Sequence, residues 1–304
     1  MNATALLYPN PPFHGGRLTD IWGRGYVMQN DPFLEVAFHG LERGEYEVEL
    51  CSPVRQRERL SASASSVSAF FVHLALADPS LSEVAVRLNA EGRTIWESAL
   101  PVSVHSIRGQ VRDFEGRPFP AYLWAVEEDL SRPQAMVQTD PEGNFVFWYP
   151  AGKRVRLFVD DETYSQTTYE CWITVDRLEG DIEVYPRVGN FEVWGLHCWH
   201  NELIWQVYFW PVSLPLDLRA RKAGRETFYG PRLARRDVTV RVNGEEVAII
   251  GFRNVRVSAG GGRTHLACLL EFPFQREKRG KPVLIQVEVN TKSRGRGEAW
   301  YVAW

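Results

Sequence analysis

Short runs of β-branched and aromatic residues recur along the whole chain, and Gly, Pro, Asn or Asp residues separate them about every 8 to 15 positions. In residues 45–50, Glu-Tyr-Glu-Val-Glu-Leu, polar and apolar side chains alternate strictly, as in a strand with one buried face. The apolar spacing of an amphipathic helix is almost absent. The pattern therefore predicts an all-β protein, because sandwiches and barrels are built from such short strands and frequent turns.

The 304 residues are too many for one ordinary sandwich, since a domain of this class has about 100 residues. With 44% hydrophobic and 24% charged residues, the chain can bury several cores. We predict three consecutive β-sandwich-like domains. They are an immunoglobulin-like sandwich with an extended N-terminal arm (1–104), a second sandwich (105–189) and an aromatic-rich, basic β domain (190–304).

The middle region contains two turn signals, at 113–116 and 140–143, where Gly116 and Gly143 supply the positive φ that such turns require. Short strands are expected around them, at 107–112, 121–126, 145–149 and 155–159. This sequence, over residues 104–188, resembles the carboxypeptidase regulatory-like domain. The resemblance implies a prealbumin-like sandwich with an accessory role. The Tyr-Arg-Gly-Ser tetrapeptide that closes hydroxyisourate hydrolases is absent, so that activity is not expected.

The strongest local signal lies in the third region. The Asn243-Gly244 pair between two β-rich runs predicts a hairpin with a type I′ turn. Residues 217–236 carry many arginines and are predicted to form a loop. Further strands are expected at 191–196, 203–210, 264–272, 283–289 and 298–304.

Aromatic residues are concentrated between 191 and 210, and both faces of the strand expected at 203–210 are apolar. One face would carry Leu203, Trp205, Val207 and Phe209, and the other Ile204, Tyr208 and Trp210. Two apolar faces indicate a central strand that is covered on both sides, or covered on one side by a partner. Packing within the protein, a protein partner and carbohydrate all remain open, and the candidate binding residues are Trp194, Trp199, Trp205 and Trp210.

Potential metal ligands also fall in this segment, namely His197, His200 and Glu202, with Cys198 between them. On a strand His197 and His200 point to opposite faces, so they would bind one ion only if a turn lay between them. Elsewhere His265 and Cys268 are the nearby candidates. We therefore predict no metal site. The acidic runs 127–129 and 160–162 are interpreted as solvated charge at strand ends rather than as calcium ligands.

Sequence motifs of catalysis are missing: the chain has no serine nucleophile elbow, phosphate-binding glycine loop or zincin motif. The glycines 260–262 lack the spacing of a nucleotide site. The chain is predicted not to be an enzyme and to need no cofactor. A metal-dependent hydrolase built on His197, His200 and Glu202 is the third hypothesis.

Charge is distributed unevenly, because residues 191–304 have more basic than acidic side chains and residues 1–190 the reverse. A basic surface of this kind suits an acidic partner. The acidic first part of a second copy would fit it, giving head-to-tail self-association. The same acidic part argues against nucleic acid. The candidate contact residues are Arg219, Arg221, Arg225, Arg235 and Arg236.

No apolar run is long enough to cross a bilayer, and the first residues lack the features of a secretory signal. Four scattered cysteines suggest buried thiols in a reducing compartment. We expect a cytoplasmic protein, or an extracellular one if a leader precedes this sequence. The first functional hypothesis is a non-catalytic structural or protein-interaction protein, and the second is carbohydrate binding through exposed tryptophans.

Overall fold

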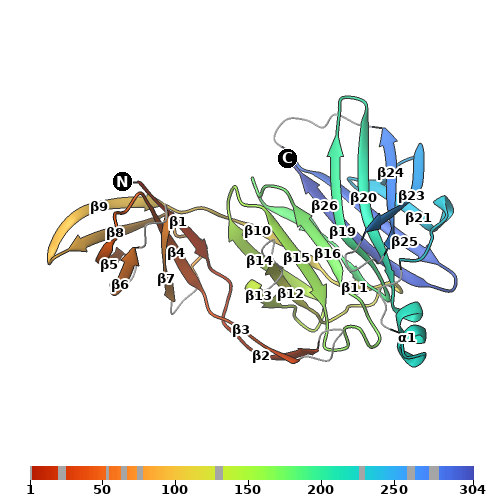
Figure 1. Cartoon of the computed structure of the whole chain (residues 1–304), viewed down its shortest axis with the longest axis horizontal. Helices are drawn as coiled ribbons and strands as arrows, with labels where there is room; N and C mark the ends of the chain where they lie inside the picture. Colours follow the sequence, from red (N-terminus) through yellow and green to blue (C-terminus); the bar gives the residue numbers. More distant parts are fainter. Residues whose placement is uncertain are drawn as a thin grey trace.

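The computed structural model describes residues 2–19, 25–52, 55–62, 67–73, 78–126, 133–225, 230–258, 264–273 and 281–304. These residues form an all-β protein, as predicted, with three sandwich cores arranged along the long axis of the molecule (Figure 1). The first and third sandwiches lie at opposite ends of this axis.

The N-terminal sandwich packs a three-stranded sheet on a four-stranded sheet. The first sheet has the order β1 (Asn2–Tyr8), β4 (Phe33–His39), β7 (Val67–His73), and the second has β6 (Gln56–Ala62), β5 (Gly44–Ser52), β8 (Glu83–Ala90), β9 (Arg93–Pro101). Alternating residues of β4 and β8, including Val36 and Val86, are completely buried between the sheets. Strands β8 and β9 are joined by a tight turn, with positive φ at Glu91 and Gly92.

A hairpin of β2 (Phe13–Thr19) and β3 (Gly25–Asn30) leaves the first sandwich and contacts β13 (Pro133–Gln138) of the second (Figure 1). The junction is fixed by Asn10, whose side-chain amide donates to the carbonyl oxygen of Trp148 at 2.9 Å and accepts from its N–H at 2.8 Å. The first part of the region expected to be an extended arm is instead strand β1 of the first sandwich, and the β2–β3 hairpin contacts the middle sandwich.

The middle sandwich packs β14 (Asn144–Pro150), β10 (Val104–Gln110) and β17 (Ile182–Val184) against four strands. These are β13, β12 (Tyr122–Val126), β15 (Val155–Asp160) and β16 (Cys171–Val175). A short parallel pair, β11 (Arg112–Asp113) and β18 (Arg187–Val188), flanks it. Both predicted turns are confirmed, because Gly116 and Gly143 have φ values of +83° and +80°.

The third sandwich packs the sheet β19 (Phe191–His200), β20 (Ile204–Ser213), β24 (Thr264–Pro273), β23 (Gly251–Ser258) on a second layer. That layer is β26 (Gly295–Ala303), β25 (Val283–Thr291), β21 (Val238–Val242), β22 (Glu245–Glu246). The hairpin predicted at Asn243 and Gly244 is confirmed, with φ values of +51° and +87°. Strand β23 was not expected, because it is a sheet edge with little buried surface.

The second and third sandwiches share one sheet. Strand β16 pairs in parallel with β26, so that eight strands run in the order β13-β12-β15-β16-β26-β25-β21-β22. The boundary predicted at 189/190 lies in the chain between β18 and β19, but this pairing crosses it. One face of the long sheet is covered by β14-β10-β17 at one end, and the opposite face by β19-β20-β24-β23 at the other. Gly297 allows the close contact, since a Cβ there would lie 1.6 Å from the oxygen of Phe191.

A buried ionic network supports the shared sheet. The Arg187 guanidinium donates to Glu298 at 2.7 Å and to Glu288 at 2.8 Å, and Trp300 Nε1 donates to Glu298 at 2.9 Å. Glu298 is completely buried and Glu288 nearly so. Burial raises the pKa of Glu298, although the bonds from Arg187 and Trp300 oppose that shift. The network links β18 to β25 and β26.

The prediction of a loop over 217–236 is wrong at its start, because α1 (Leu214–Lys222) occupies it. Pro215 fits the first turn, Asp217 follows it, and basic residues end the helix, as the helix dipole favours. Asp217 is buried and accepts a 2.5 Å hydrogen bond from Tyr169. A short 3-10 turn, η1 (Arg235–Asp237), follows. Within the described chain no helix is long and apolar enough to cross a membrane.

Replacement of Arg187 by Met should lower the free energy of unfolding by about 2 to 4 kcal/mol, because it leaves the buried Glu298 without its cation and Glu288 with Arg241 alone. Urea unfolding would measure the change. The double variant Arg187→Met/Glu298→Gln should recover part of the loss, since it removes one stranded charge. A single variant as stable as the wild type would contradict the proposed role of the network.

Candidate functional site

The outer face of the β19-β20-β24-β23 sheet carries most of the predicted aromatic candidates. On the inner face Trp205, Val207 and Phe209 are almost completely buried in the core. On the other face Tyr208 and Trp210 are half-buried. Strand β20 is therefore central, as expected. At one end of its outer face, Trp194 and Val212 pack against residues of the 161–170 loop and of α1.

Strand register sets three rows of side chains on this face. The first is Trp199, Gln206, Glu271, Gly251; the second is His197, Tyr208, Leu269, Arg253; the third is Trp194 and Trp210, with Ala267 and Val255 paired farther along. Each row crosses the sheet from β19 to β23. We call this surface the aromatic face.

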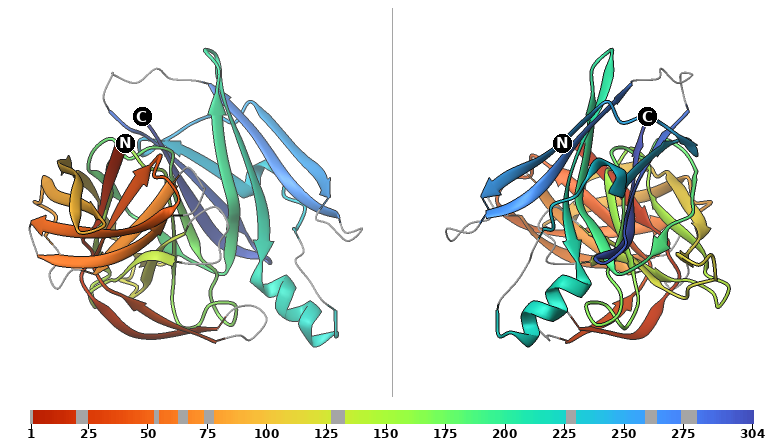
Figure 2. Two further views of the ribbon diagram at one scale, coloured as in Figure 1. Left: turned by 60° about the vertical axis from the view of Figure 1, so that its left-hand side comes forward. Right: turned by 90° about the vertical axis from the view of Figure 1, so that its right-hand side faces the viewer.

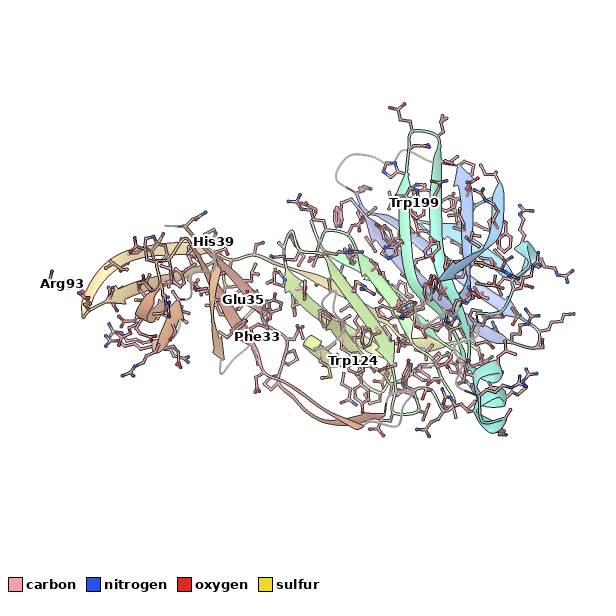
Figure 3. All side chains as sticks on the ribbon, viewed as in Figure 1. Phe33, Glu35, His39, Arg93, Trp124 and Trp199 are labelled. Atoms are coloured by element: carbon pink, nitrogen blue, oxygen red, sulfur yellow. The ribbon has the colours of Figure 1, made fainter. Side chains whose placement is uncertain are left out.

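Hydrogen bonds connect the polar side chains of the first row. Trp199 Nε1 donates to Gln206 at 2.6 Å, and Gln206 Nε2 donates to Glu271 at 3.1 Å. Arg253 donates to the same oxygen of Glu271 at 3.0 Å. Trp199 is 45% exposed and lies on β19 near the β19–β20 hairpin, which projects beyond the neighbouring strands (Figures 2 and 3). Its indole ring is thus held in place while remaining accessible.

The two tryptophans of the third row lie in a cluster of aromatic rings that includes side chains beside the row. The Trp194 and Trp210 ring centroids are 5.0 Å apart, and Trp210 stacks on His265 at 5.5 Å. Trp210 Nε1 donates to the Tyr208 hydroxyl at 2.5 Å. Together these contacts fix the orientation of four adjacent rings on the outer face.

A β-bulge brings Trp194 and Trp199 to the same face. These residues are five apart, and in a regular strand an odd separation places side chains on opposite faces. The register of β19 against β20 shifts between Trp194 and His197, where Gly195 has a φ of +62°. The extra residue restores Trp199 to the side of Trp194. Sequence alternation alone does not reveal such a shift.

The structure does not gather the weak metal candidates. His197 is on the outer face, whereas His200 points the other way and its ring lies 4.5 Å from that of Trp205. Glu202 is exposed at the hairpin tip. Burial, with Arg154 and Arg156 nearby, lowers the pKa of His197. No group of three His, Cys, Asp or Glu side chains suited to a metal occurs among the residues described.

The arginine candidates fall in two places. Arg219 and Arg221 lie on α1, which Arg225 follows, and Arg221 donates to the Ser165 oxygen at 3.0 Å. Arg235 and Arg236 lie in η1, beside two shallow pockets of about 760 and 850 Å³ that flank residues 232–234. The glycines 260–262 and the acidic run 127–129 lie outside the described residues, as do three further basic residues of the third region, Arg276, Lys278 and Arg279.

Sequence reasoning missed a pair of buried carboxyl groups between β16 and β19. Glu192 accepts from Trp172 Nε1 at 2.8 Å and is hydrogen-bonded to Glu170, which is also bonded by Tyr164. Burial raises the pKa of Glu170 to about 7 and that of Glu192 well above its ordinary value. Burial thus favours the protonated form of both carboxyl groups. Isolated carboxylates in a sequence give no sign of such a pairing.

The interpretation of 160–162 as solvated charge is wrong for Asp160, which is 1% exposed and accepts from Trp124 Nε1 at 3.1 Å. Burial raises its pKa well above the ordinary value. Asp161 instead accepts from Thr163 and Thr168 in the following turn. The loop 161–170 covers the end of β15 at Asp160. The alternation of polar and apolar residues in β15 does not indicate this cover.

No protein-family model and no curated protein matches this sequence. Among solved structures, a candidate carbohydrate-binding protein from Bacteroides uniformis is similar at 10% identity and a TM-score of 0.22, over 66% of this chain and 98% of that one. A DUF3823 family protein from Parabacteroides merdae is similar at 12% identity and a TM-score of 0.23, over 66% of this chain and 98% of that one. A marsupial T cell receptor is similar at 8% identity and a TM-score of 0.20, over 100% of this chain and 99% of that one. These values assign no function.

The Glu170–Glu192 pair should make stability depend on pH. The pKa of Glu170 is raised from 4.5 to about 7 in the folded state. Its contribution to the free energy of unfolding is therefore fully present below pH 4.5 and is lost as the pH rises toward and beyond 7. Urea unfolding of the wild type should lose up to about 3 kcal/mol over that range. Glu170→Gln, which cannot ionise, should lose less. An equal loss in both proteins would contradict the pairing.

Proposed function

We propose that this chain is a non-catalytic carbohydrate-binding protein and that the aromatic face is its binding surface. The observation that carries the proposal is the placement of Trp194, Trp199, Tyr208 and Trp210 on one outer sheet face. Partly exposed apolar side chains gathered on one face are typical of interaction surfaces.

The chemistry of this face suits a sugar. A pyranose ring has an apolar C–H face, which an aromatic ring can cover, and a rim of hydroxyl groups that need hydrogen-bond partners. Gln206, Glu271 and Arg253 provide planar donors and acceptors beside the rings. Ligand sites are lined mostly by apolar and aromatic side chains, and a small number of fixed polar groups gives them specificity.

Several features favour binding over catalysis. Glycoside hydrolysis uses two carboxyl groups on either side of the scissile bond. Glu271 on the aromatic face already accepts from both Gln206 and Arg253, which suits a positioned acceptor. Glu192, on β19 of the same sheet, is buried and accepts a hydrogen bond from Trp172 Nε1.

Surface charge bears on head-to-tail self-association at one position. In that arrangement the basic third sandwich would contact the acidic residues of 1–190, including those of the N-terminal sandwich. Its central acidic residue, Glu49, is instead buried among Arg55, Arg57 and Arg87, and Arg87 also pairs with Glu97. These charges are compensated locally, so Glu49 itself has little left to offer a second copy.

We also propose that residues 104–188 form a carboxypeptidase regulatory-like module, as the sequence resemblance implies. Its two glycine turns and its two facing sheets support this assignment. In that role it is an accessory module, which holds the third sandwich through the shared sheet rather than binding ligand itself.

Replacement of Trp199 or Trp210 by Ala should weaken glycan binding about tenfold or more, because each substitution removes the large contact area of an indole ring. Binding would be measured by tryptophan fluorescence and affinity electrophoresis against neutral and acidic polysaccharides. Phe71→Ala is the matched control, since Phe71 is 55% exposed on the N-terminal sandwich. Binding to none of the polysaccharides, or equal binding by all variants, would overturn the proposal.

A further inference from the structure

We infer that the bound carbohydrate is acidic, and that its sulfate or carboxylate groups occupy a basic pocket at the β23 edge of the aromatic face. This inference rests on the proposed function and specifies its ligand class. The pocket has a volume of about 760 Å³, and its cationic lining residues are Arg232, Arg235, Arg253 and Arg256. A second basic pocket adjoins it across residues 232–234.

The pocket is continuous with the aromatic face. Arg253 and Val255 belong both to its lining and to the rows that cross the sheet. The hydrogen-bonded row from Trp199 through Gln206 and Glu271 ends at Arg253. Three strand spacings separate the two ends, about 14 Å. A short oligosaccharide that lies across the sheet would therefore reach from the tryptophan to the arginines.

The backbone beside the pocket is fixed before any ligand arrives. Asn254 holds Leu233 from both sides, accepting from its N–H at 3.0 Å and donating to its carbonyl oxygen at 2.9 Å. The Leu233 side chain is buried in the core, and Asp237 accepts from the Ala234 N–H at 2.8 Å. The neighbouring arginines thus extend from a rigid segment, which lowers the entropic cost of binding.

Arg253 pairs with Glu271, but most of the other basic side chains here have no acidic partner among the described residues. Within the described residues Arg232, Arg235, Arg236, Arg256 and Lys292 form no ion pair. Such a concentration of uncompensated positive charge repels itself and attracts anions. The guanidinium group binds sulfate and carboxylate oxygens through two parallel hydrogen bonds. Charge complementarity therefore selects an anionic glycan over a neutral one.

The second pocket extends the basic surface toward α1. It is lined by Arg232, Arg236, Lys292 and Arg294, and has a volume of about 850 Å³. Arg294 donates to the Arg232 carbonyl oxygen at 2.5 Å, so the two pockets share one wall. Two adjoining pockets suit a ligand with repeated anionic groups better than a single small anion.

The test compares neutral and acidic oligosaccharides on the whole protein: dextran with dextran sulfate, and galactan with polygalacturonate. We expect the sulfated and carboxylated probes to bind more tightly than their neutral counterparts, and the two acidic arms to identify which anion is preferred. Arg235→Gln/Arg256→Gln should weaken acidic binding about tenfold or more while leaving neutral binding unchanged.

The matched control is Arg43→Gln/Arg93→Gln, which removes the same charge from the distant N-terminal sandwich, where Arg93 lies at the far end of the molecule (Figure 3). Equal weakening by both double variants would show unspecific attraction and overturn the inference. Equal affinity for neutral and acidic probes, lost in Trp199→Ala, would overturn the inference but support the proposed function. Binding of neither class would overturn the proposed function itself.

Discussion

The parallel pairing of β16 with β26 is the contact on which the rest of the structure depends. It joins two sandwiches into one long sheet. In the middle sandwich one face of this sheet is covered, and in the third sandwich the opposite face is covered. The Arg187 network and the close approach at Gly297 hold the two layers together there. The β19-β20-β24-β23 sheet then has its inner face fully occupied, and its aromatic side is left outward.

The aromatic face follows from one irregularity in an otherwise regular sheet. Without the bulge at Gly195, Trp199 would point into the core and the first row would lose its indole. With it, rings from β19 and β20 meet on the same side, beside Gln206, Glu271 and Arg253. The basic segment at 232–237 is then placed at the opposite edge by the clamp from Asn254. The binding surface and the anion pocket thus meet at the edge strand β23, where Arg253 and Val255 border both.

Local signals in the sequence predicted local structure well. The Asn243-Gly244 turn, the glycine turns of the middle sandwich and the two-faced pattern of β20 all depend on near neighbours in the chain. The β16–β26 pairing joins residues more than a hundred positions apart, and the Glu170–Glu192 pair depends on the loop that buries it, so neither has a local signature. The bulge in β19 placed Trp194 and Trp199 together, whereas Trp205, an equal candidate by composition, belongs to the core.

The most direct test of the account is amide hydrogen exchange with and without an oligosaccharide of dextran sulfate. The account predicts slower exchange in β20, β23, β24 and residues 230–237, because the ligand covers one sheet face and its basic edge. The N-terminal sandwich should be unchanged. Protection confined to that sandwich or to the β14-β10-β17 sheet, with none on β20 or β23, would contradict it.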